Sequence, residues 1–94
     1  MFGTVGRAHI KPENKEKFVE VLGNQTTDVH GFRGAYVMFP ENREGEVVLV
    51  AMFDDADSYW KNADDPAQHQ RYLEYRALLE DEPEWSDGEW FGTP

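Results

Sequence analysis

The chain has 94 residues, of which 39% are hydrophobic and 30% charged, a composition typical of a folded domain rather than a disordered segment. Its net charge is −10, and its nine basic residues are scattered, which argues against binding to nucleic acid or to an anionic membrane surface. It has no cysteine and no apolar run of the roughly 18–20 residues that a membrane span needs. We expect one domain over residues 1–94, located in the cytoplasm because no signal peptide is visible.

Patterns of apolar residues predict elements in the order strand, helix, strand, strand, helix, strand. The expected strands cover residues 2–10, 32–39, 47–53 and a short stretch around residues 88–92. The first helix is expected over about residues 12–23, where Pro12 suits its first position. The second helix begins after Asp54 as its N-cap, is interrupted at residues 64–66 and continues to residue 80.

The third predicted strand, Val47–Phe53, is apolar at every position. Side chains of a strand alternate between two faces, so both of its faces must be buried. Helices on one side of the sheet can cover one face, and the sheet of a second copy is the simplest cover for the other. We therefore expect an α+β, ferredoxin-like β-α-β-β-α-β fold with a four-stranded antiparallel sheet, which pairs with a second copy as a homodimer.

In two other predicted strands, the alternation of side chains between the two faces of the sheet predicts which residues share a face. Over residues 32–39, strict alternation places three side chains on one face: Phe32, Tyr36 and Met38. Gly31 and Gly34 indicate a bulge or a close approach of the backbone. In the first strand, Arg7 and His9 alternate with apolar residues. They are expected to line the space between the two sheets or a pocket mouth, or to pair with an acid of the second copy.

Several short motifs carry a resemblance that covers nearly the whole chain. They are Ile10-Lys11-Pro12-Glu13, His30-Gly31-Phe32-Arg33-Gly34, the run from Val47 to Asp54 followed by Ser58-Tyr59-Trp60, Asp65-Pro66, Arg76-Ala77-Leu78-Leu79-Glu80 and Pro83-Glu84-Trp85. With these motifs the chain resembles the antibiotic-biosynthesis-monooxygenase-like family of the dimeric α+β barrel superfamily. The resemblance implies sheet-to-sheet pairing into a dimeric α+β barrel.

The resemblance implies three possible functions, because this fold carries unrelated activities. The first is a cofactor-independent monooxygenase that acts on a small aromatic or quinol-type substrate. The second is a non-catalytic, small-ligand-binding or stress-associated protein. The third is a haem-binding or haem-degrading protein, for which Trp60 and His69 are the matching residues, although Gly6 stands where that branch has an Asn. Asn62, Trp60, Tyr72 and Arg76 supply the residue types of the polyketide-oxygenase branch at a different spacing.

A cleft is expected between the helices and the sheet, because Gly6 and Ala8 leave space beneath an aromatic helix segment. The competing interpretation is that the aromatic rings simply fill this space. Together with the resemblance, the cleft predicts a site for a small apolar or aromatic molecule. The substrate-binding residues are expected to be Thr4, Tyr36, Met38, Trp60, His69 and Tyr72.

The sequence assigns no catalytic residue, although His69 or Tyr72 is expected to hydrogen-bond a substrate hydroxyl. Taken alone, Trp60 is more typical of a core residue and His69 of a surface histidine. The three His lack the HxxxH or HxxE spacing of metal ligands, so no metal is expected. GxSxG, GxGxxG and P-loop motifs are missing too, and no cofactor is expected.

Overall fold

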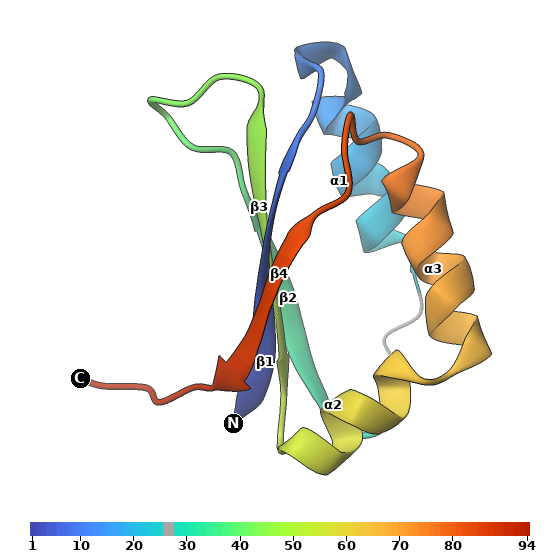
Figure 1. Ribbon diagram of the computed structural model, residues 1–94, viewed down its shortest axis with the longest axis vertical. Helices are drawn as coiled ribbons and strands as arrows, with labels where there is room; N and C mark the ends of the chain where they lie inside the picture. Colours follow the sequence, from blue (N-terminus) through green and yellow to red (C-terminus); the bar gives the residue numbers. More distant parts are fainter. Residues whose placement is uncertain (26–27) are drawn as a thin grey trace.

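The computed structural model describes residues 1–25 and 28–94 and shows two layers, a sheet and a group of helices on one of its faces (Figure 1). The elements are β1 (Phe2–His9), the 3₁₀ turn η1 (Pro12–Asn14), α1 (Lys15–Gly23), β2 (Phe32–Met38), β3 (Glu46–Phe53), α2 (Ala56–Ala63), α3 (Pro66–Arg76) and β4 (Glu84–Glu89). The four antiparallel strands lie in the order β2-β3-β1-β4. This is the expected ferredoxin-like α+β fold. No described helix is long and apolar enough to cross a membrane.

The hydrophobic core lies between the inner face of the sheet, which the helices cover, and helices α1 and α3. Ala8 of β1 lies opposite Val47 of β3, and both are buried. Phe18 of α1 is fully buried and meets Tyr75 of α3 edge to face, with ring centroids 5.9 Å apart. Aromatic pairs in this arrangement stabilise a core beyond the area that they bury.

The structure corrects the alternation expected in β2. The pairing with β3 skips one residue between Phe32 and Gly34, so Phe32 lies opposite Phe53 and shares the inner face with it, their ring centroids 5.5 Å apart. Phe32 therefore does not share a face with Tyr36 and Met38. Gly34, at φ 145°, lies in this bulge, as the glycine pattern indicated.

Several helix boundaries differ from the expected ones, and for α2 the reason is a different capping side chain. The N-cap of α2 is Asp55 rather than Asp54: its carboxylate accepts a hydrogen bond from the Ser58 N–H, at 2.8 Å. Asp65 caps α3 by accepting from the Ala67 N–H at 2.9 Å, and the helix ends at Arg76 instead of residue 80. Residues 12–14 form a 3₁₀ turn before α1 starts, a common geometry at helix N-termini.

The last strand begins four residues earlier than expected, at Glu84. Before it, Leu79 forms an isolated bridge with Ile10, and the Glu80 N–H donates to the His9 carbonyl at 2.8 Å. These bonds bring the chain alongside β1 directly after α3. β4 therefore pairs with β1 over residues 84–89.

All helices that the structure describes lie on one face of the sheet, so the outer face carries none of them (Figure 1). Its central strand, β3, contributes Val48, Val50 and Met52 to this face. On the edge strand β2, the side chains of Tyr36 and Met38 are 69% and 54% exposed. Such an apolar sheet face is what sheet-to-sheet pairing requires, and the homodimer stays a prediction.

Candidate functional site

A cavity of about 890 Å³ lies between the sheet and the helices, and we call it the main cavity. Its sheet side includes Thr4, Ala35, Val37, Leu49, Ala51 and Phe53. Its helix side includes Leu22, Tyr59, His69, Tyr72 and Tyr75. Ligand pockets are typically apolar and aromatic with a few polar groups, and this composition follows that rule.

The indole ring of Trp85 fills the space above Gly6. The two residues are cross-strand partners of β4 and β1, and a Cβ placed on Gly6 would lie 2.5 Å from Cζ3 of the ring. The space above this glycine is therefore filled, but by a tryptophan from the last strand and not by the rings of the helix segment. Trp85 lines the main cavity, and Gly6 is not among its lining residues.

Three polar side chains meet at the β4 side of the main cavity. The Tyr59 hydroxyl donates to Oδ1 of Asp87 at 2.5 Å, and Asp87 lies opposite Thr4 across the β1–β4 pair. Thr4 Oγ1 donates to the Ser86 carbonyl at 3.2 Å. Thr4 also lies close enough to Tyr59 to lower its pKa slightly, against the larger effects that raise it. Burial, with the hydrogen bond to Asp87, raises the pKa of Tyr59 to about 12. Tyr59 is thus an O–H donor throughout the neutral range.

A second polar group lies on α3. The rings of His69 and Tyr72 have centroids 6.4 Å apart, and both residues line the main cavity. The Tyr72 hydroxyl donates to Glu82, which also pairs with Arg76. Burial and this hydrogen bond raise the pKa of Tyr72, so it too stays protonated near neutrality. His69 itself is exposed, as expected for a surface histidine, yet it borders the cavity.

The structure brings four of the six expected substrate-binding residues to the main cavity: Thr4, Tyr36, His69 and Tyr72. Tyr36 borders the cavity from β2, although most of its side chain is exposed. Met38 and Trp60 are not among the residues that line it. Met38 lies on the outer face, while the half-exposed Trp60 packs on Tyr59, with ring centroids 4.9 Å apart. Trp60 and His69, the expected haem pair, therefore do not share this cavity.

Sequence reasoning missed Asp87 and Trp85 as site residues. Asp87 stands beside Gly88, a pair typical of a turn, and the last strand was expected only from about residue 88. In the structure both residues lie inside β4, with Trp85, Asp87 and Glu89 two residues apart on one face. The period-two spacing of Trp85, Asp87 and Glu89 is the signal that could have placed them together on one strand face.

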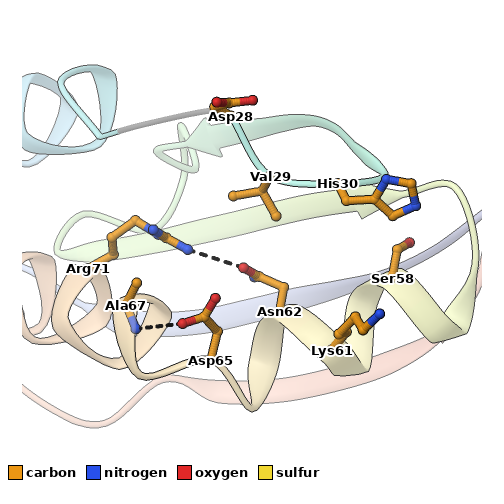
Figure 2. A pocket seen from close by; sticks show the side chains of 9 residues that line it. All are labelled: Asp28, Val29, His30, Ser58, Lys61, Asn62, Asp65, Ala67 and Arg71. Atoms are coloured by element: carbon orange, nitrogen blue, oxygen red, sulfur yellow. Dashed lines mark hydrogen bonds between the residues drawn. The ribbon is translucent and has the colours of Figure 1, made fainter.

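A second, smaller cavity of about 300 Å³ adjoins the main one (Figure 2). Its walls come from the segment 28–30, α2 and the start of α3, and include His30, Lys61, Asn62, Asp65 and Arg71. The Arg71 guanidinium donates to Oδ1 of Asn62 through Nη2 and to Oε1 of Gln68 through Nε, both at 3.1 Å. Val29, Asn62 and Arg71 line both cavities.

Residues 1–81 match the family model for antibiotic biosynthesis monooxygenase. The chain belongs to this family. No curated protein matches the chain significantly. The match ends before β4, so Asp87 and Trp85 lie outside the matched region.

Solved structures similar to this family member have low sequence identity and the same fold. A conserved protein from Methanosarcina mazei Go1 is 14% identical with a TM-score of 0.76, over 93% of this chain and 89% of that one. Rv0793 from Mycobacterium tuberculosis is 14% identical with a TM-score of 0.73, over 98% and 96%. SnoaB, a cofactor-independent oxygenase from Streptomyces nogalater, is 17% identical with a TM-score of 0.69, over 98% and 94%.

Proposed function

We propose that this protein is a cofactor-independent monooxygenase that oxygenates a small hydroxylated aromatic molecule of the quinol type in the main cavity. The observation that carries the proposal is the cavity itself, which has aromatic and aliphatic walls and tyrosine hydroxyls at two places, each bonded to a carboxylate: Tyr59 to Asp87 and Tyr72 to Glu82. Family membership and the likeness to SnoaB support the reaction class. A volume of about 890 Å³ is ample for a molecule of two or three fused rings.

The proposed reaction needs no electrons beyond those of the substrate. Removing a proton from one hydroxyl gives an electron-rich phenolate, and its ring carbon forms a C–O bond with O₂. After protonation this adduct is a hydroperoxide. Loss of the C–H proton from that carbon then breaks the O–O bond and releases water, which leaves a carbonyl. For a hydroquinone the balance is quinol plus O₂ to hydroxyquinone plus water, with one oxygen atom in each product.

Each polar group of the cavity has a role in this sequence. We assign His69 as the group that accepts the hydroxyl proton, since imidazole is the commonest general base in enzymes. Tyr72, protonated and next to His69, turns its single O–H from Glu82 to the same oxygen when substrate binds. Thr4 and Tyr59 orient the other end of the ring, and the apolar walls exclude water from the reacting carbon. Tyr36 borders the ligand at the β2 edge.

Oxygen uptake with 1,4-dihydroxynaphthalene and related quinols tests the proposal. Wild type is expected to exceed the buffer rate, and His69→Ala to lower the rate by roughly 10²–10⁴-fold if His69 is the base. Tyr72→Phe is expected to lower the rate as well, because it removes the O–H donor. His30→Ala is the matched control, since His30 lines the small cavity and not the main one.

Three results would contradict different parts of this proposal. Wild type that consumes no oxygen but shows quenched tryptophan fluorescence with a naphthol would support the non-catalytic ligand-binding function instead. If both His69→Ala and Tyr72→Phe still turn over the substrate, the proposed activity stands, but the roles assigned to His69 and Tyr72 are wrong. A Soret band on titration with hemin would support the haem-binding alternative.

The remaining expectations about partners are part of the same proposal. The protein acts as a homodimer in the cytoplasm and uses no cofactor. It binds neither nucleic acid nor membranes, because its charge is −10 and its basic residues are scattered.

A further inference from the structure

The wall between the two cavities contains a positively charged side chain. Arg71 of α3 and Asn62 of α2 line both the main cavity and the small one, with Val29 beside them. Figure 2 shows the Arg71 side chain reaching across to the Asn62 amide. A ligand whose ring occupies the main cavity can therefore place a substituent against Arg71.

Hydrogen bonds to neutral amides orient the Arg71 side chain and leave its positive charge in place. Its two side-chain partners, Asn62 and Gln68, are amides, and the Asn62 side chain also donates to Gln68 at 3.3 Å. In the part of the chain that the structure describes, no carboxylate forms an ion pair with Arg71, although acids outnumber bases by 19 to 9. Of the five N–H groups of a guanidinium, these bonds use two. The others can bind an anionic group.

The chemistry of the small cavity favours a carboxylate over a phosphate. A guanidinium binds a carboxylate with two parallel N–H donors. Lys61 adds a second positive charge to the wall, but Asp28 and Asp65 line it too, and their charges oppose a dianion more strongly than a monoanion. The carboxylate of Asp65 already accepts from the Ala67 N–H of α3.

We infer that Arg71, held by Asn62 and Gln68, is the specificity-determining residue of the site and binds the carboxylate of a hydroxylated aromatic acid. The inference rests on the proposed function for the position of the ring in the main cavity. It narrows the substrate class to phenolic or quinol-type aromatic carboxylates.

The test compares two probes with the same ring, 1,4-dihydroxy-2-naphthoate and 1,4-dihydroxynaphthalene. Their dissociation constants are measured by tryptophan fluorescence without oxygen, so that binding is separated from turnover. Wild type is expected to bind the carboxylate probe about tenfold to hundredfold more tightly, the range of a charge-assisted hydrogen bond. Arg71→Gln is expected to abolish this preference, because it weakens binding of the carboxylate probe far more than binding of the diol. Arg43→Gln, with the same charge change on an exposed turn, is the control.

A second variant keeps the test independent of any folding defect in Arg71→Gln. Asn62→Asp preserves the side-chain shape and places a carboxylate on the Arg71 guanidinium, so it is expected to remove the preference as well. Equal affinity of wild type for the two probes, or a preference that survives in both variants, would overturn the inference while leaving the proposed function intact. Failure of wild type to bind either probe would overturn both.

Discussion

The ion pair between His9 and Asp81 fixes the end of β1 to the segment that follows α3. Nδ1 of His9 lies 2.7 Å from Oδ2 of Asp81, and the His9 N–H donates to Oδ1 at 2.8 Å. The acid that pairs with His9 therefore belongs to its own chain. The hydrogen bond to Asp81 is the main cause that raises the pKa of His9, and the same contact lowers the pKa of Asp81.

The pair predicts a specific dependence of stability on pH. A raised histidine pKa stabilises the fold below the unfolded value of about 6.5, and this contribution is lost as pH rises through the folded pKa. A lowered aspartate pKa stabilises above about 3.9, and this contribution is lost as pH falls through the folded pKa. Asp81→Asn should therefore lower the melting temperature more at pH 5.5 than at pH 9. Asp64→Asn is the control, and an equal loss at both pH values would contradict the prediction.

Helix α2 is anchored to the sheet by a close contact between Gly31 and Ser58. Gly31 precedes β2 with φ +80°, and its carbonyl accepts from the Asp54 N–H at 2.8 Å. A Cβ on Gly31 would lie 2.4 Å from Oγ and 2.5 Å from Cβ of the buried Ser58. The first turn of α2 therefore packs directly on the backbone before β2, beside the small cavity.

Substituting this glycine should disturb both the helix and the small cavity. Gly31→Ala is expected to lower the free energy of unfolding by about 1–3 kcal/mol, because alanine is strained at positive φ and the Ser58 Cβ cannot move aside freely. Denaturant unfolding measures the change. Gly23→Ala is the matched control, since its Cβ would meet nothing within 4 Å. If Gly31→Ala lowers the free energy of unfolding no more than Gly23→Ala does, the contact between Gly31 and Ser58 does not require a glycine.

At the scale of the whole molecule, the helices leave one face of the sheet open. The outer residues of β3 and β2 are apolar, and Tyr36 exposes 69% of its surface there. Obligate interfaces resemble a divided core and bury about 2,000 Å² or more. A second copy would cover this face and leave the main cavity, on the opposite face, accessible to ligand.

Charge on the outer face should separate the dimer. We expect wild type to be a dimer by light scattering at micromolar concentration, and Met38→Asp on the outer face of β2 to disrupt it, because a buried unpaired carboxylate is costly. Leu73→Asp is the control, since Leu73 is a similarly exposed apolar residue on α3. A wild-type protein that is a well-folded monomer under these conditions would contradict the prediction.

The sequence alone determined the order of the strands and helices along the chain, the two-sided apolar character of β3 and the ferredoxin-like class. These features depend on local periodicity and on turn residues, which act over a few positions. The glycine signals were sufficient to indicate the bulge at Gly34 and the close approach at Gly31. Thr4, His69 and Tyr72 were placed at the cavity because strand and helix faces follow from the same periodicity.

Tertiary structure alone decided which polar groups meet in the cavity. Asp87 reaches Tyr59 because β4 pairs with β1, and this register joins residues more than 80 positions apart, beyond any local pattern. The same register places Trp85 over Gly6. Arg71 faces the wall between the cavities because the packing of α2 and α3 brings it to Asn62. A side chain's partners are set by the packing of distant elements, which periodicity does not encode.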